Sequence, residues 1–191
     1  MKQIRPPTQN LSGWKWYLDT HIIDSLSASE LFELYADGWV YLEAPDAVLV
    51  EITAAKDESK REELIDSISQ FPIPLGPITL GSSLVGFGVV GSNDDQSRLD
   101  KVHSIIWLGH TFGDDSAKME SNKTARSRVR DTLIVANALR HGVNGLITHD
   151  EHLAASSVRL REAGYLLEFL RIEEATRRVR DLKTKYLSRR N

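Results

Sequence analysis

The stretch at residues 130–153, RDTLIVANALRHGVNGLITHDEHL, decides the fold class of this chain. Residues 133–139 are apolar on nearly every side, and a helix of that composition lies between layers rather than on a surface. Gly142 is a natural residue to follow a helix C-terminus, and residues 145–148 have the length and apolarity of a short buried strand. A buried helix followed at once by a buried strand predicts an α/β fold.

The same stretch places an aspartate at one end of each predicted element. Asp131 stands at the beginning of the apolar helix, and Asp150 follows the strand. Asp19 has the matching place near the N-terminus, directly after a predicted strand at residues 14–18. In open parallel sheets the carboxyl ends of the strands face the crevice where ligands bind. Both strand-end aspartates are therefore candidates for a functional site.

Glu51 is an isolated charge in an otherwise apolar run at residues 47–55. Apolar neighbours on both sides predict burial, which is costly for a carboxylate that has no cation or hydrogen-bond donor nearby. Taken singly, Asp19 and Asp150 are explained equally well as helix caps, and Asp131 as an acid that complements a helix dipole. Four acids at matching places favour one shared site over four separate coincidences.

These residues resemble the motifs of the PIN-domain ribonucleases, including their toxin-type members. The motifs are a strand-end aspartate in YLDT (17–20), a glutamate in VLVEI (48–52), an aspartate opening the Ala-rich DTLIVANA (131–138), and THD (148–150). The resemblance covers about the first seventy residues and residues 126–168. It implies a three-layer α/β/α PIN-like fold with a central, mostly parallel sheet.

The domain organisation follows from the extent of that resemblance. We expect a PIN-like nuclease domain at residues 1–170, with an insertion around residues 71–125 where the chain exceeds the compact members of the family. Residues 171–191 hold eight Lys or Arg against three acids and show a narrow apolar seam, which predicts a basic amphipathic C-terminal helix. Packing onto its own domain, a homodimer contact, an antitoxin protein and an RNA-facing surface all remain open for this helix.

The resemblance also implies a chemistry, namely metal-dependent hydrolysis of RNA phosphodiester bonds by an endoribonuclease. Converging carboxylates suit a hard divalent cation, Mg²⁺ or Mn²⁺, while the absence of Cys and the scattered His disfavour zinc. Such a cation neutralises charge on a phosphodiester and lowers the pKa of water. The predicted metal ligands and catalytic residues are Asp19, Glu51, Asp131 and Asp150.

The resemblance gives supporting roles to two threonines, and the local charge gives one to three arginines. The hydroxyls of Thr20 and Thr148 are expected to orient the carboxylates through hydrogen bonds. Arg126, Arg128 and Arg130 lie just before Asp131 and are predicted to bind RNA phosphates. The alternative for this basic cluster is a flexible, solvated loop with no ligand.

Two other functions compete with the ribonuclease. One is a Mg²⁺-dependent phosphatase of the HAD type, which is disfavoured because His21 stands where that family has a second aspartate. The other is a catalytically silent PIN-like module that binds RNA or a protein. Retention of all four acids argues against the silent module.

Composition limits the setting in which this chemistry would occur. The chain has 191 residues, no cysteine and a formal net charge of −3. Crossing a bilayer takes roughly 20 consecutive apolar residues, and no such run is present. The first ten residues also lack the apolar centre of a secretory signal. We therefore expect a cytoplasmic protein with no membrane partner.

Local signals predict the remaining scaffold. A capping box at Ser27 and Glu30 predicts a helix over residues 27–37, and a strand is expected at residues 39–42. Further helices are expected at residues 57–69 and 94–110. The pair Asp114 and Asp115 is interpreted as part of a surface turn, with a role as auxiliary metal ligands as the alternative.

Overall fold

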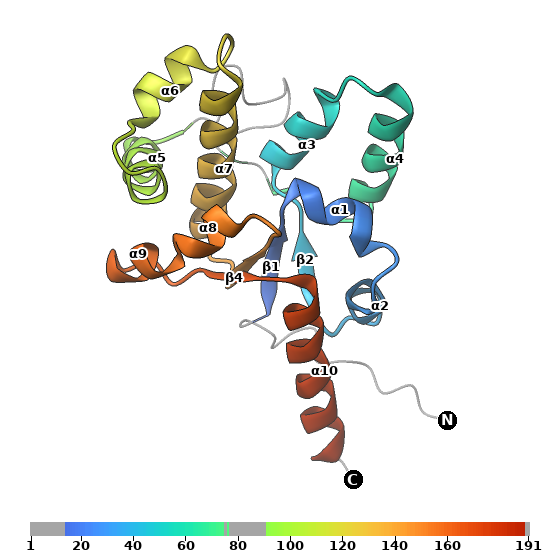
Figure 1. The fold of residues 1–191 in the computed structure, drawn as a ribbon. Helices are drawn as coiled ribbons and strands as arrows, with labels where there is room; N and C mark the ends of the chain where they lie inside the picture. The colour runs from blue at the N-terminus through green and yellow to red at the C-terminus, as the bar shows by residue number, and fades with distance from the viewer. Residues whose placement is uncertain (1–13, 75, 77–90, 190–191) are drawn as a thin grey trace.

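A four-stranded parallel sheet organises the protein, seen in a computed structural model that describes residues 14–74, 76 and 91–189. The strands lie in the order β2-β1-β3-β4, with helices flanking the sheet (Figure 1). This arrangement confirms the predicted three-layer α/β/α class with a central parallel sheet. The strands are β1 (Lys15–Leu18), β2 (Tyr41–Glu43), β3 (Gly145–Ile147) and β4 (Glu168–Leu170).

The sheet connections reverse direction between its two central strands. From β1 the chain passes through α1 (Thr20–Leu26) and α2 (Glu30–Ala36) to β2 at one edge. From β3 it passes through α8 (Glu151–Ala155) and α9 (Ser157–Glu162) to β4 at the other edge. The carboxyl ends of β1 and β3 therefore flank a topological switch point, where α/β sheets open a crevice for ligands.

The long connection from β2 to β3 supplies five of the ten helices in the described part of the chain. Its last helix, α7, packs against α3, α5, α6 and β3, and its residues from Thr132 to Ala138 are all buried. The predicted buried helix is thus confirmed. The connection consists of α3 (Asp46–Thr53), α4 (Glu58–Ile68), α5 (Asn93–Ile106), α6 (Phe112–Lys118) and α7 (Lys123–Arg140).

Helix α7 begins earlier than the sequence indicated. Its N-cap is Asn122, whose side-chain oxygen accepts hydrogen bonds from the backbone N–H groups of Thr124 and Ala125 at 2.9 and 3.1 Å. The expectation that Asp131 opens the helix is therefore wrong, since Asp131 lies near its middle. The basic residues before Asp131 also belong to this helix, so a flexible loop is excluded for them.

Two other boundaries differ from the predictions because a nearby residue makes the better cap or turn. Ser29 caps α2 by accepting from the N–H of Phe32 at 3.3 Å, whereas Ser27 ends the preceding helix, so the capping box at Ser27 is wrong. Gly38 adopts a positive φ of 77°, and the chain enters the sheet only at Tyr41. The helix expected at residues 57–69 is confirmed as α4, capped by Asp57.

The region of the predicted insertion holds two packed helices in its described part. Helix α5 ends at Ile106, four residues before the expected end, and Thr111 then caps the short helix α6. Asp114 and Asp115 are in the first turn of α6, so their assignment to a surface turn is wrong. Residues 75 and 77–90, which also belong to the predicted insertion, lie outside the described residues.

The C-terminal amphipathic helix is confirmed as α10 (Ile172–Ser188), and its apolar seam packs on its own domain. Ile172, Ala175 and Val179 are buried, and the ring of Tyr186 meets Trp39 at a centroid distance of 5.6 Å. On the polar side, Arg180 pairs with Glu30 of α2. Within the described residues, no helix has the length and apolarity required to span a membrane.

Candidate active site at the carboxyl ends of the strands

Asp19 and Asp150 come together because they follow two adjacent strands. Leu18 and Ile147 are neighbours in the sheet, and the N–H of Asp19 continues the ladder by donating to the carbonyl of Ile147 at 3.0 Å. The Thr148 hydroxyl then links both aspartates. It donates to Oδ2 of the buried Asp19 at 2.5 Å and accepts from the backbone N–H of Asp150 at 2.9 Å.

Both aspartates also cap the helices that follow them. Oδ1 of Asp19 accepts from the N–H of Thr20 at 2.7 Å, and Oδ1 of Asp150 accepts from the N–H of Leu153 at 2.9 Å. Capping and a shared site are therefore compatible rather than alternatives. In each residue the cap hydrogen bond falls on one carboxylate oxygen and fixes the direction of the other.

Glu51 reaches the same region from helix α3. Its Oε2 accepts a hydrogen bond from the Thr20 hydroxyl at 2.7 Å, and its Oε1 lies 3.7 Å from Nη1 of Arg130 on α7. The Glu51 side chain is 33% exposed, so the prediction that Glu51 is buried is wrong. The apolar neighbours Val48 and Ile52 are buried, whereas this carboxylate is partly open to solvent.

Burial and the neighbouring acids both act on Asp131. Burial raises its pKa, and the negative charges of Asp19, Asp150 and Glu51 add to the rise, to a value of about 8, against the opposing charge of Arg130. The pKa of Asp19 is raised as well, chiefly by burial, although the Thr148 hydrogen bond partly opposes the shift. The four acids thus act on one another electrostatically although they come from four different elements.

The four carboxylates are not arranged as the ligands of one ion. Among the residues that the structure describes, no group of three or more His, Asp or Glu side chains is positioned to hold a metal together. Carboxylates without a counter-ion repel one another, and this repulsion opposes the short spacing that a shared ion requires. Drawing them into a coordination shell would take side-chain movement.

The three predicted RNA-binding arginines have different surroundings. Arg128 makes two hydrogen bonds of 2.6 Å to Asp115, and Arg126 donates to the carbonyls of Met119 and Glu120. Both guanidinium groups are therefore held by the protein itself. Arg130 faces the acids, and in the described part of the chain its buried Nε has no hydrogen-bond partner.

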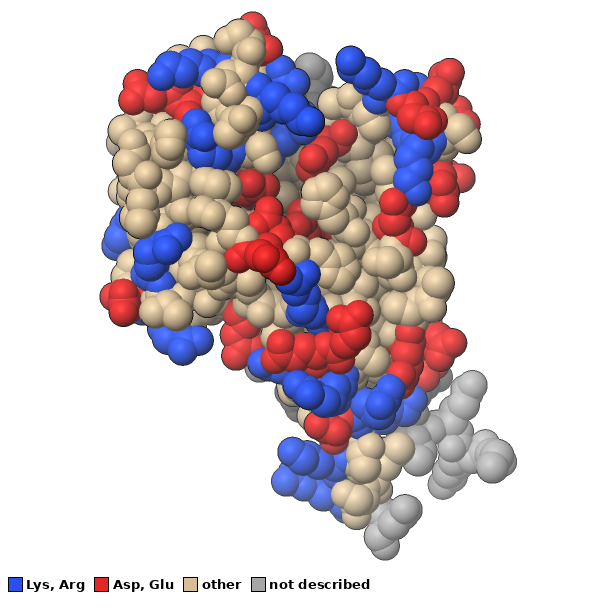
Figure 2. Space-filling view, in the orientation of Figure 1, with Lys and Arg blue, Asp and Glu red and all other residues tan. Residues whose placement is uncertain are grey.

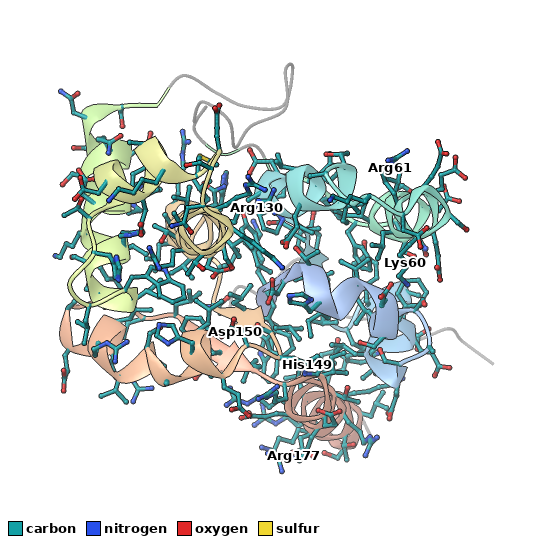
Figure 3. All side chains as sticks on the ribbon, turned by 45° about the horizontal axis from the view of Figure 1, so that its top comes forward. Lys60, Arg61, Arg130, His149, Asp150 and Arg177 are labelled. Carbon is teal, nitrogen blue, oxygen red and sulfur yellow. The ribbon has the colours of Figure 1, made fainter. Side chains whose placement is uncertain are left out.

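The surface at the carboxyl ends of the strands is hollowed and acidic. Figure 2 shows Asp and Glu side chains gathered in the middle of this face, between the α7 side and the α3 side, with Lys and Arg along the upper rim. In the tilted view of Figure 3, Arg130, His149 and Asp150 lie in the central region, whereas Lys60 and Arg61 lie at the α4 end. The rim can meet an anion while the centre attracts cations.

Arg171 is a site residue that the motifs did not indicate. It follows β4, and its Nη1 donates to the carbonyl of His149 at 2.7 Å, while Nη2 lies 3.6 Å from Glu151. These contacts hold the turn that carries Asp150. The sequence feature that could have indicated it is its position directly after the fourth strand, at the carboxyl ends of the strands where Asp19 and Asp150 also lie.

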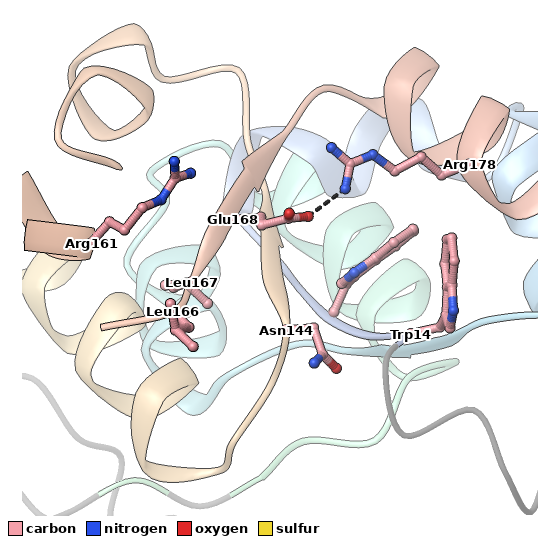
Figure 4. A pocket seen from close by; sticks show the side chains of 8 residues that line it. Trp14, Asn144, Arg161, Leu166, Leu167, Glu168 and Arg178 are labelled. Atoms are coloured by element: carbon pink, nitrogen blue, oxygen red, sulfur yellow. Dashed lines mark hydrogen bonds and ion pairs between the residues drawn. The ribbon is translucent and has the colours of Figure 1, made fainter. Parts of the chain in front are cut away.

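A separate cavity of about 660 Å³ lies at the amino ends of the strands, on the other side of the sheet from the acids. Figure 4 shows it bordered by residues at the amino ends of the strands, including Trp14, Asn144 and Glu168, with Glu168 paired to Arg178. None of the four predicted acids lines this cavity. We therefore place the candidate active site at the carboxyl ends, where the acids converge, rather than here.

The fold and this site define a three-layer α/β protein with an acidic cluster at its topological switch point. Comparison with protein-family models, curated proteins and solved structures found no significant match.

Proposed function

We propose that this protein is a metal-dependent ribonuclease that hydrolyses RNA phosphodiester bonds at the acidic cluster. One observation carries the proposal, namely that four acids from separate elements converge where two central parallel strands end. Asp19 and Asp150 share the hydroxyl of Thr148, and burial together with the charges of the other three acids raises the pKa of Asp131 to about 8. The motif resemblance to PIN-domain ribonucleases adds RNA as the substrate.

The donor set fits a hard divalent cation. All four side chains offer carboxylate oxygens, the ligands that Mg²⁺ and Mn²⁺ prefer, and a cation would relieve the repulsion that raises the pKa of Asp131. Asp19, Asp131 and Asp150 would hold it, with Glu51 completing the set. When bound, the ion would supply charge neutralisation at the phosphodiester.

The protein residues would prepare and orient the reacting groups. The Thr148 hydroxyl fixes the carboxylate of Asp19, and the Thr20 hydroxyl fixes that of Glu51. Glu51 is the most suitable residue to accept a proton from an attacking water, because it is partly open to solvent and lies beside Arg130. Arg130 would shift from Glu51 toward an incoming phosphate.

Cleavage of a mixed RNA pool tests the proposal directly. Purified protein is incubated with RNA and Mg²⁺ or Mn²⁺, with EDTA as the metal-free condition. The Asp19→Asn variant is expected to lose cleavage, while the matched Asp66→Asn variant, with its exposed aspartate on α4, is expected to cleave normally. Retention of uncleaved RNA by the wild-type protein would instead support a silent binding module, and metal-dependent release of phosphate from phosphomonoesters alone would support a phosphatase.

Toxin activity paired with an antitoxin is a further part of this proposal, supported by the motif resemblance. Expression of the wild-type protein in growing cells is compared with expression of the Asp19→Asn variant. Growth arrest by the wild-type protein alone would show that the toxic effect requires the acidic cluster. Homodimer formation is measured separately by light scattering.

A further inference from the structure

The cavity at the amino ends of the strands is large enough to hold a small molecule. Its volume of about 660 Å³ falls within the roughly 300–1,000 Å³ that small-molecule sites occupy. Trp14, Asn144 and Leu167 come directly before β1, β3 and β4, so three parallel strands bring their preceding residues to its wall (Figure 4). The acidic cluster lies at the other ends of these strands, and the two sites are therefore separate.

Two tryptophans supply an aromatic part of the cavity wall. The ring centroids of Trp14 and Trp16 are 5.4 Å apart and their planes are tilted by 54°, so the rings do not stack face to face. Trp16 is buried, whereas Trp14 is only partly buried and also borders a second, smaller cavity beside α10. Leu166, another wall residue, is 81% exposed. Aromatic and apolar surface that is open to a cavity favours a ligand with a ring.

The polar part of the wall offers hydrogen-bond donors. Oδ1 of Asn144 accepts from a backbone N–H at 3.4 Å, which leaves its Nδ2 group free to donate. Within the described residues, the indole N–H of Trp16 and the guanidinium of Arg161 have no hydrogen-bond partner. Glu168 is the one carboxylate among the described wall residues, and it is paired with Arg178. Donors without a free carboxylate beside them fit a ligand that is rich in acceptor oxygens.

The charge of the wall indicates an anionic ligand as well. Arg178 is paired with two acids, Glu168 and, at 2.7 Å, Glu174. Arg161, exposed in the last turn of α9, has no acidic partner in the described part of the chain. The helix dipole of α9 accounts for a cation at this end, but it does not account for a free guanidinium in the wall of an aromatic cavity. A guanidinium binds carboxylate or phosphate through paired hydrogen bonds.

We infer that the cavity at the amino ends of the strands is a second binding site, and that its ligand is a small organic anion built on a planar ring. Arg161 binds the anionic group, and the ring packs against Trp14 and Leu166. Nucleoside monophosphates and aromatic carboxylic acids share this chemistry. The site goes beyond the proposed ribonuclease reaction, because none of the four acids borders the cavity.

Isothermal titration calorimetry of the full-length protein with adenosine monophosphate and with indoleacetate tests the inference and distinguishes the two sources of the anion. EDTA is present, so that no metal holds a phosphate at the acidic cluster. At least one of the two anions is expected to bind. Arg161→Gln is expected to weaken this binding roughly ten- to a hundredfold, as loss of a hydrogen bond to a charged group does. Adenosine and indole, which lack the anionic group, are expected to bind wild type and Arg161→Gln equally.

The contribution of the ring is measured at Trp14. Trp14→Ala is expected to weaken binding roughly five- to a hundredfold, as loss of one stacking contact does, and Trp14→Phe is expected to retain most of it. Thermal unfolding of each variant identifies a loss of fold, and in that case the comparison rests on Trp14→Phe and Arg161→Gln. Arg177→Gln is the matched control and is expected to bind like wild type. It removes another exposed arginine that has no partner among the described residues and does not border this cavity.

Three results would overturn the inference. They are binding of neither anion, equal binding by Arg161→Gln and Arg177→Gln, and loss of binding in Asp19→Asn, which would place the ligand at the acidic cluster. None of these measurements depends on whether the wild-type protein cleaves RNA. Failure of the ribonuclease proposal and failure of the second binding site are therefore distinguishable.

Discussion

The hydroxyl of Thr148 donates a 2.5 Å hydrogen bond to the buried carboxylate of Asp19 across the two central strands. The same oxygen accepts from the N–H of Asp150, so a single hydroxyl joins both strand-end acids. This bond opposes the rise in the pKa of Asp19 that burial causes. The geometry of the cluster therefore depends on a residue that carries no charge.

Replacing Thr148 with valine, which has nearly the same shape, is expected to destabilise the protein by about 1–3 kcal/mol. The change leaves the Asp19 carboxylate and the Asp150 N–H without their partner in a buried place. Urea unfolding of Thr148→Val measures the loss, and Thr148→Ser, which keeps the hydroxyl, is the control. Equal stability of all three proteins would show that this hydrogen bond contributes nothing.

Asp131→Asn is expected to raise stability at neutral pH in the absence of metal. The pKa of Asp131 in the folded protein, about 8, is above its ordinary value of 3.8, so the folded state binds more protons between these values. Stability then falls as the pH rises from about 4 to about 8, by an amount on the order of a few kcal/mol. Asparagine removes this penalty.

The pH dependence of unfolding checks this assignment. The difference in unfolding free energy between Asp131→Asn and wild type should be small near pH 4, grow through neutral pH and level off above about pH 8. Asp66→Asn, on the exposed side of α4, is the matched control. A difference that stays constant with pH would mean that Asp131 does not titrate in this range.

Divalent cations are expected to stabilise the wild-type protein more than any variant that lacks one of the four acids. Binding to the folded state alone adds about 2.7 kcal/mol when the free metal is at 100 times its dissociation constant. Thermal unfolding with and without Mg²⁺ or Mn²⁺ measures the shift, and EDTA should reverse it. A shift of the same size in Asp150→Asn would place the metal elsewhere.

Arg128→Ala is expected to reduce stability far more than Arg130→Ala. Arg128 is 14% exposed, and its two hydrogen bonds hold the pKa of the buried Asp115 carboxyl below its ordinary value, with His103 on the same carboxylate. Removing one partner of a buried pair costs about 3–5 kcal/mol. Urea unfolding compares the two variants. Similar losses for both would show that Arg130 supports the fold as much as Arg128 does.

Several features of the fold were predictable from the amino-acid sequence alone. The all-round apolarity of residues 133–139 and the short strand after Asn144 predicted a buried helix and a parallel sheet, and both are present. The same patterns put Asp19 and Asp150 at strand ends, since a strand must stop where its apolar run stops. These features depend on residues that are close in sequence, because the pattern of apolar residues over a short segment determines its preference for helix or strand.

Only the tertiary structure decided which side chains meet. Asp131 proved to lie in the middle of α7, and Arg128 proved to be held by Asp115, thirteen residues away. The stacking of Trp107 on His152 joins residues 45 positions apart. Such contacts arise from how helices pack over the sheet, and neither periodicity nor capping signals encode that packing. The sequence alone thus determined which acids are present and the order of the helices and strands. The packing of these elements determined which side chains each acid and arginine contacts.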